Sequence, residues 1–200
     1  MSMAGTTPAG TTPKKRLTAD DWTAAALEAI AEGGVQAAAV EPLAKRLGAT
    51  KGSFYWHFTN RRELLDRTMD AWERVHTDAV IVATSASPDA PERIAVLLEA
   101  AFESVTEPLE QALFAAADDP SVGAAVARVT ERRIDYVASL YRAAGQDEET
   151  ARSSAVAAFA TYLGHAQLAA AAPRTLPTGA AWTAHVAHLR ALYAAGPGGR

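Results

Sequence analysis

The sequence predicts an all-α protein of about nine helices, in which a small three-helix helix-turn-helix domain precedes a larger helical domain. Apolar residues recur at the three- and four-residue spacing of helices, and breaks rich in Gly or Pro separate these stretches. No convincing run of alternating β-branched residues indicates a strand. Because 49% of the 200 residues are hydrophobic, the chain can bury a sizeable core.

The chain begins with a segment that we expect to be disordered. Residues 4–13 repeat the sequence AGTTP twice, and the basic residues KKR follow. Such a composition buries little apolar surface, so we predict a tail over residues 1–16. The tail either keeps the protein soluble or acts as an arm whose basic end enters a nucleic-acid groove.

Two helices follow the tail. Thr18 and Asp21 have the spacing of a capping box, and Gly33 marks the end of the first helix. The second helix lies in VEPLAKRLGA, with Pro42 in its first turn and a break at Gly48. Both helices are short enough to belong to one small domain.

The stretch ATKGSFYWHFTN, residues 49–60, places four aromatic rings and a histidine in five consecutive positions. Thr50 is placed to cap a third helix, which follows the second after the turn GAT. Phe54 and Phe58, four residues apart, are expected to pack inward. The neighbouring Tyr55, Trp56 and His57 then lie toward solvent or partly so. The second helix of such a unit presents residues to base edges in the major groove of DNA.

Charge is unevenly distributed. The net charge is −4, but residues 1–65 carry eight Lys or Arg against six Asp or Glu, whereas residues 66–200 carry eleven against seventeen. This pattern indicates either a phosphate-binding face on an acidic body or an ordinary solvated charge cluster.

The rest of the chain is helical by pattern. Asn60 and Glu63 have capping-box spacing and begin a long helix that runs toward Ala83. Pro91, Pro108 and Pro120 each stand near the start of a later helix, and two more helices complete the chain. The charged stretches ERRID and DEE are expected to be solvated helix surface.

The run LAKRLGATKGSFYWHFTNRRELL, from Leu43 to Leu65, resembles the DNA-binding signature of the tetracycline-repressor (TetR) family of bacterial transcription regulators. The resemblance covers roughly residues 17–66 and implies a DNA-binding domain over 17–65 and a ligand-binding and dimerisation domain over 66–200. The DNA-binding candidates on matched positions, together with their exposed neighbours, are Glu41, Thr50, Lys51, Gly52, Ser53, Tyr55, Trp56, His57 and Arg61.

Two positions depart from the family pattern. In the family, the helix before the turn usually starts with a Thr or Ser that caps it and contacts phosphate, whereas this chain has Val40 there. The next residue, Glu41, either accepts a hydrogen bond from a cytosine amino group or simply benefits from the positive end of its helix.

The mechanism that the resemblance implies is a homodimer on a palindromic double-stranded DNA operator, released by an unidentified small molecule. Repression rather than activation is the family-level expectation, and no cofactor is implied. Seven polar or aromatic residues are candidates for the ligand pocket: Phe102, Phe114, Tyr136, Tyr141, Tyr162, His165 and Gln167. Trp72 and His76 are weaker candidates below them. The dimer candidates are Phe159, Leu163, Ala166, Trp182, Val186 and Leu189.

Other functions are disfavoured. Zero cysteines exclude disulfides and thiolate metal sites, and the pair His185 and His188 lacks a neighbouring carboxylate, so no metal is expected. No apolar stretch of membrane-spanning length and no secretory leader is present, which predicts a cytoplasmic protein without membrane partners. The alternatives are a helical interaction module and a small all-α enzyme, although no catalytic motif is present.

Overall fold

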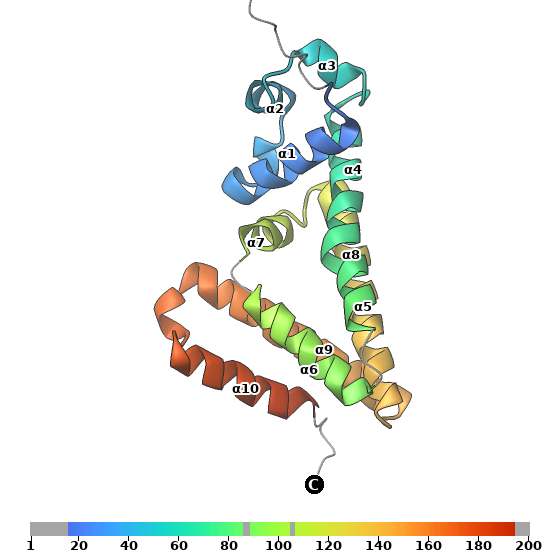
Figure 1. The fold of residues 1–200 in the computed structure, drawn as a ribbon, viewed down its shortest axis with the longest axis vertical. Coiled ribbons are helices and arrows are strands. Elements are labelled where there is room, and N and C mark those ends of the chain that lie inside the picture. The colour runs from blue at the N-terminus through green and yellow to red at the C-terminus, as the bar shows by residue number, and fades with distance from the viewer. Residues whose placement is uncertain (1–15, 86–88, 105–106, 195–200) are drawn as a thin grey trace, which may run out of the picture.

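The computed structural model describes residues 16–85, 89–104 and 107–194, and the predicted tail therefore lies almost entirely outside the described residues. All regular structure in these ranges is helical (Figure 1). The elements are α1 (Ala19–Gly33), η1 (Val35–Ala37), α2 (Val40–Arg46), α3 (Lys51–Tyr55), α4 (Arg61–Glu73), η2 (Arg74–Asp78), α5 (Ala79–Thr84), α6 (Ala90–Glu103), α7 (Pro108–Ala115), α8 (Pro120–Ala143), α9 (Glu148–Ala171), η3 (Pro173–Thr175) and α10 (Ala180–Ala194).

The long helix predicted from Asn60 toward Ala83 is present, but its middle is π-helical. The segments α4, η2 and α5 follow one another without a break, and η2 has π-helix hydrogen bonding. Counted as one helix, they bring the described part of the chain to nine α-helices, as predicted. A π-segment within an α-helix is rare and often accompanies a functional site.

Polar side chains cap the helices of the N-terminal domain much as the sequence predicts. The Thr18 hydroxyl accepts a hydrogen bond from the Asp21 amide at 3.2 Å, and the Asp21 carboxylate accepts one from the Thr18 amide at 2.7 Å. At the start of α4, the Asn60 side chain accepts from the Glu63 amide at 3.0 Å. The Glu63 carboxylate, however, accepts from the amide of Thr59 at 2.7 Å rather than that of Asn60.

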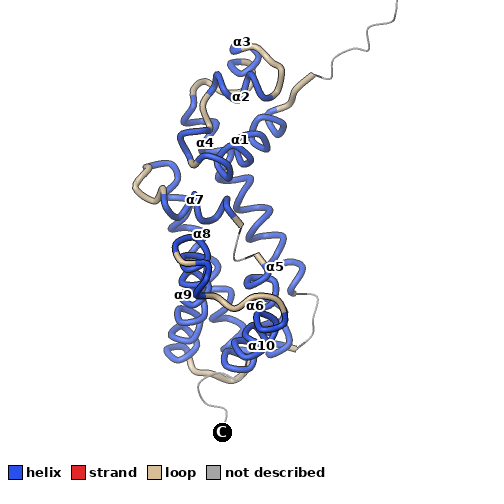
Figure 2. Tube along the Cα trace, turned by 90° about the vertical axis from the view of Figure 1, so that its left-hand side faces the viewer, coloured by secondary structure: helices blue, strands red, loops and turns tan. Residues whose placement is uncertain are grey.

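The two domains share a core. Helices α1 to α3 form one end of an elongated molecule, and the long helix α4–η2–α5 runs from them alongside α8 (Figures 1 and 2). The buried cluster that holds Trp22 and Phe54 extends through Leu64 to Leu113 of α7 and Val129 of α8. The predicted boundary between residues 65 and 66 thus lies inside a helix, so a shift of that helix moves both domains.

A second buried cluster holds the C-terminal domain together. It joins α6, α8, α9 and α10, with Phe102, Tyr141 and Leu189 among its members. Within the described ranges, no helix is both long enough and apolar enough to cross a bilayer.

Candidate nucleic-acid interface and ligand pocket

Helices α2 and α3 and the turn between them form a helix-turn-helix unit. Gly48 has a positive φ of 58°, the left-handed conformation that favours glycine, and it ends α2. The Ala49 amide donates to the Ala44 carbonyl at 2.8 Å, which fixes the angle of the turn. Thr50 then caps α3 by accepting a hydrogen bond from the Ser53 amide at 3.2 Å, as predicted.

The aromatic run divides between the core and the surface. Phe54 and Phe58 are buried, and the Phe54 ring meets Trp22 edge to face at a centroid distance of 5.4 Å. Tyr55 and Trp56 are 60% and 81% exposed, and His57 is half-buried. The inward and outward directions predicted for these rings are confirmed. Together, the adjacent exposed rings of Tyr55 and Trp56 form an aromatic patch that can serve as a contact surface.

The basic residues near this surface are partly engaged within the protein. Lys51 at the start of α3 forms an ion pair with Glu41 of α2. Glu41 therefore links the two helices, a role that the sequence analysis did not consider. The hydrogen bond and charge of Lys51 lower the pKa of the Glu41 carboxyl. Both side chains are more than half exposed, so phosphate can compete with this pair.

Arg61 has a structural role that the sequence does not indicate. Its Nε donates to the carbonyl of Ala38 at 2.8 Å, and a terminal nitrogen donates to that of Val35 at 2.6 Å. These bonds tie the start of α4 to η1, and they occupy two of the five N–H groups of Arg61. The predicted phosphate contact is thus left to the remaining N–H groups.

The position that lacks a capping side chain is Ala39, one residue before the predicted Val40. The N-cap of α2 is Ala39, which has no side-chain oxygen, and Val40 is the first residue of the helix. No side chain caps α2, because neither residue can accept a hydrogen bond.

Comparisons with known proteins agree with this geometry. Residues 23–68 match the family model described as bacterial regulatory proteins, tetR family. The N-terminal domain belongs to the tetR family. The chain is also 45% identical over 47 residues to the tetracycline repressor protein class A from transposon 1721 of Escherichia coli, a match that covers 24% of this chain and 22% of that repressor. The chain thus spans about a fifth of the length of this curated relative.

Solved structures extend the likeness to the whole fold. A TetR transcriptional regulator from Legionella pneumophila superposes with a TM-score of 0.72 at 18% identity, covering 88% of this chain and 96% of that one. The transcriptional regulator FadR from Bacillus subtilis, solved in complex with stearoyl-CoA, superposes with a TM-score of 0.67 at 14% identity. That match covers 92% of this chain and 100% of the FadR chain. The tetR-family domain is therefore followed by a helical domain of the architecture that these regulators have.

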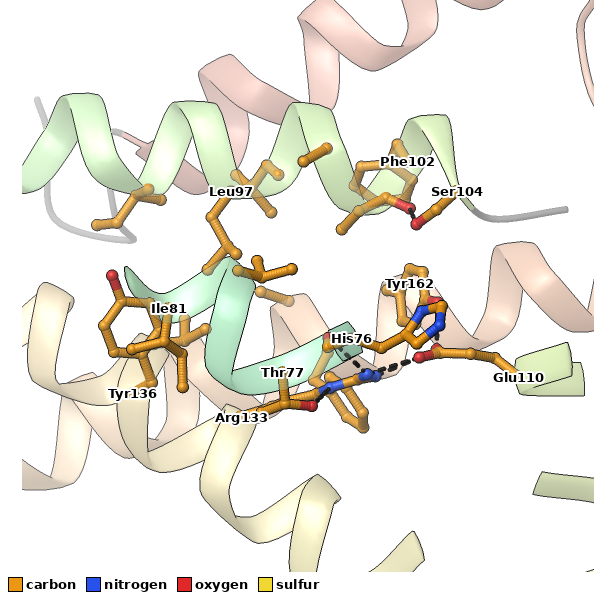
Figure 3. Close-up of a pocket in the computed structure, with 18 of the residues that line it drawn as sticks. His76, Thr77, Ile81, Leu97, Phe102, Ser104, Glu110, Arg133, Tyr136 and Tyr162 are labelled. Atoms are coloured by element: carbon orange, nitrogen blue, oxygen red, sulfur yellow. Dashed lines mark hydrogen bonds and ion pairs between the residues drawn. The ribbon is translucent and has the colours of Figure 1, made fainter. Parts of the chain in front are cut away.

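A cavity of about 280 Å³ lies between α6, α8, α9 and the π-helical part of the long helix (Figure 3). Its volume is near the lower end of the range for small-molecule sites. Three of the seven predicted pocket residues, Phe102, Tyr136 and Tyr162, line it. His76, the weaker candidate, also lines it, whereas Trp72 is fully buried in the core.

The other four pocket candidates lie elsewhere. Phe114 and Gln167 line a second hollow between α7 and α9. Tyr141 is a buried core residue whose hydroxyl donates to the Tyr193 carbonyl at 2.9 Å, and burial raises its pKa to about 12. His165 packs against Phe102 from outside the cavity. Helical spacing did not distinguish these positions, because core and pocket share one apolar face.

The polar end of the cavity contains a buried ion pair that the sequence analysis missed. Arg133 donates to both carboxylate oxygens of Glu110, at 3.1 and 2.6 Å, and the Tyr162 hydroxyl donates to the same carboxylate at 2.6 Å. Burial opposes ionisation of Glu110, but the bonds from Arg133 outweigh it and hold the pKa of the carboxyl below its usual value. Burial, and then the Glu110 carboxylate, raise the pKa of the Tyr162 phenol. The stretch ERRID is therefore not uniformly solvated.

The residues predicted for the dimer contact also lie in different parts of the structure. Val186 and Leu189 are buried within their own chain, where α10 packs on α6, and this stripe is thus not free for a partner. Phe159 lines the cavity, and Leu163 and Ala166 line the second hollow. Trp182 is half-buried beside His165.

A different face of α9 is exposed and uncharged. It carries the exposed residues Ala157, Ala160, Gly164 and Leu168, spaced by three or four residues, and the exposed Val156 beside Ala157. These residues were not separated from the core stripe in the sequence because α9 is apolar on both sides. Small side chains on an exposed helix face permit close approach of another helix.

One of the two histidines that share a face of α10 contacts a histidine of α9. His185 meets His165 rather than His188, with 2.8 Å between their Nε2 atoms. The Nδ1 atom of His165 lies 2.7 Å from the Thr161 carbonyl. Burial, followed by the neighbouring histidines, lowers the pKa of His185. Among the described residues, no three His, Asp or Glu side chains gather in a way that could hold a metal ion.

Proposed function

We propose that the protein is a ligand-responsive, DNA-binding transcriptional regulator that acts as a homodimer in the cytoplasm. The observation that carries this proposal is the outward surface of α3, where Lys51, Gly52, Tyr55 and Trp56 are exposed on a helix-turn-helix unit of the tetR family. Such a helix enters the major groove, where its side chains reach base edges and phosphates. Repression is the expected sign of regulation.

The proposed dimer contact is the exposed, uncharged face of α9 together with neighbouring exposed apolar residues of α10. Ala184, Ala187 and Leu192 of α10 are exposed, as are Ala157 and Ala160 of α9. Two helices from each protomer would then form a four-helix contact. A two-fold symmetric dimer places two recognition helices on half-sites related by the same symmetry.

The long helix supports a mechanism for release of the operator. Its first turns carry Leu64 and Leu65, which are part of the N-terminal core, and its π-helical segment carries His76 and Thr77, which line the cavity. A ligand that fits the cavity better in one position of this helix shifts the population toward that position. A differential affinity of ~10²-fold, or about 2.7 kcal/mol, suffices for a useful switch.

The test is fluorescence anisotropy of the full chain on the DNA immediately upstream of its own gene, beside a scrambled duplex and at several salt concentrations. We expect a dissociation constant of ~10⁻⁸ M or tighter for the upstream DNA, and we expect the affinity to fall steeply as the salt concentration rises. The same measurement is made on a library of other operator-like palindromes. If none of these duplexes binds more tightly than scrambled DNA, the result would favour a helical interaction module. Binding that salt leaves unchanged would contradict phosphate recognition.

A further inference from the structure

The cavity offers no unpaired positive charge to a ligand. That a ligand binds in this cavity rests on the proposed function, whereas the arrangement of charges in it does not. Arg133 is the single Lys or Arg among the described residues that line the cavity. Both oxygens of Glu110 accept from it, which neutralises the pair. A second carboxylate, Glu107, stands exposed at the rim. The electrostatics of the site therefore disfavour an anion.

Arg133 is also held by the π-helical segment. Its Nε donates to the Thr77 hydroxyl at 3.0 Å, and a terminal nitrogen donates to the His76 carbonyl at 3.1 Å. With the two bonds to Glu110, most N–H groups of this guanidinium are already used. Moving it toward a ligand would break these contacts and leave Glu110 buried without its partner, which is strongly unfavourable.

The His76 ring is another polar group of the lining. It lies at the same end of the cavity as Glu110 and Tyr162 (Figure 3), and within the described part of the chain the ring has no hydrogen-bond partner. Burial lowers the pKa of His76, against the opposing effect of Glu110, so the ring is neutral near pH 7. A neutral imidazole has one N–H donor and one nitrogen acceptor. It can therefore bind a hydroxyl, a carbonyl or an amide.

The remaining walls are apolar except at Ser104, whose hydroxyl already donates to the Ala101 carbonyl at 3.1 Å. Ile94, Leu97, Leu98 and Phe102 of α6 face the cavity, with Val137 and Phe159 from α8 and α9. Tyr136 adds a ring at the far end, but its hydroxyl is paired with that of Thr84 at 2.7 Å. An apolar body is thus favoured along most of the ligand, with a polar atom at one end.

We propose that the cavity takes an uncharged ligand, with an apolar body and one terminal hydroxyl, carbonyl or amide group that hydrogen-bonds to His76. His76 is then the residue that determines which polar group is accepted. Glu110 and Arg133 exclude anions, because each satisfies the other. This specificity differs from the stearoyl-CoA that the FadR neighbour holds.

Three probes of equal chain length test the charge preference: decan-1-ol, decanoate and decylamine. Isothermal titration of the full-length protein near neutral pH compares their affinities, with stearoyl-CoA as a fourth probe. We expect decan-1-ol to bind at least ~10-fold more tightly than either charged probe, because burial of an unpaired charge is costly. Equal affinities, a preference for any charged probe, or no binding of decan-1-ol would overturn the proposal.

Two substitutions of His76 test the hydrogen bond. His76→Phe keeps a ring of similar size, and we expect it to weaken decan-1-ol binding by ~3–10-fold, the range for one neutral hydrogen bond. His76→Gln keeps a donor and an acceptor and is expected to retain most of the affinity. Decane serves as a probe without a polar atom, and the ratio of decan-1-ol to decane affinity in each variant separates the hydrogen bond from the different polarity of Phe and Gln. Equal decan-1-ol affinity in both variants would remove His76 from the site.

Substitution of the neighbouring carboxylate tests the exclusion of anions. Glu110→Gln leaves Arg133 with a free charge, and we expect the ratio of decanoate to decan-1-ol affinity to rise at least ~10-fold. Glu131→Gln is the matched control, because Glu131 also pairs with an arginine, Arg152, but lies on the exposed surface. An unchanged ratio in a folded Glu110→Gln protein would contradict the electrostatic argument. Circular dichroism checks folding, and the wild-type and His76 comparisons decide the proposal if this variant unfolds.

Release of operator DNA is measured separately by anisotropy. Tight binding of decan-1-ol without release supports the ligand class and contradicts the ligand-responsive function. Specific operator binding by a protein that does not bind decan-1-ol overturns the ligand class and leaves DNA recognition standing. The two proposals can therefore fail independently.

Discussion

The two ends of the molecule present their chemistry in opposite directions. In the N-terminal domain, candidate residues such as Tyr55 and Trp56 point outward from α3, whereas in the C-terminal domain His76, Glu110 and Arg133 point inward to a cavity. The family model matches residues 23–68 alone, whereas the Legionella regulator and FadR, which match nearly the whole fold, are only 18% and 14% identical. Double-helical DNA has one overall shape, whereas small-molecule ligands differ in shape. The sequence of the N-terminal domain is therefore easier to recognise than that of the C-terminal domain.

The largest effect should come from opening the N-terminal core. Phe54→Ala removes a fully buried ring that contacts Trp22, and we expect a loss of about 3–5 kcal/mol of unfolding free energy. Urea denaturation followed by circular dichroism measures it. Trp56→Ala is the matched control, because that ring is 81% exposed and its removal should change stability by less than about 0.5 kcal/mol. Similar losses in both variants would contradict the division of the aromatic run.

The inward-facing site should respond to both mutation and pH. Arg133→Met leaves the Glu110 carboxylate buried without its cation, and we expect a loss of about 3 kcal/mol near neutral pH. Arg142→Met is the control, because the Arg142–Glu148 pair is exposed and contributes about 1 kcal/mol or less. Urea denaturation of each variant gives these values.

The sign of the pH dependence follows from the pKa of Glu110. The folded-state pKa of Glu110 is lowered, so the stabilisation is complete above the unfolded-state pKa and is lost as pH falls through the folded-state pKa. Arg133→Met removes the group that lowers this pKa. The difference in unfolding free energy between wild type and variant should therefore shrink on acidification. A difference that grows below pH ~4 would contradict the assignment.

The contrast between the domains also explains what the sequence could predict. Caps at Thr18 and Thr50 and the inward direction of Phe54 follow from rules that act within a few residues, and the structure confirms them. The Arg133–Glu110 pair joins residues 23 apart in sequence. No pattern among neighbouring residues of the sequence predicts this ion pair or the π-helical turn. Likewise, the sequence predicts a dimer contact at Val186, because an apolar stripe does not reveal whether it packs against its own chain or against a second copy.

A smaller effect is expected for an outward-facing ring. Tyr55→Ala should weaken operator binding by about 1–3 kcal/mol and leave the dimer intact, because the ring is 60% exposed. Anisotropy measures binding, and sedimentation measures the dimer. Tyr55→Phe separates the hydroxyl from the ring, since it keeps the edge contact with Phe54. If Tyr55→Ala binds the operator as tightly as wild type, Tyr55 does not belong to the interface.

The smallest change tests whether DNA approaches the backbone of α3. A Cβ added at Gly52 would meet only the Thr50 hydroxyl oxygen at 3.6 Å, an ordinary contact, and the backbone there needs no positive φ. The fold itself therefore does not require glycine, and Gly52→Ala should raise the unfolding free energy by about 0.5 kcal/mol. If operator DNA comes close to this backbone, the same methyl group should weaken binding. Thermal unfolding and anisotropy on one preparation measure both effects. Higher stability with unchanged operator affinity would place the phosphates away from Gly52, whereas opposite changes would identify it as a position kept for the partner rather than the fold.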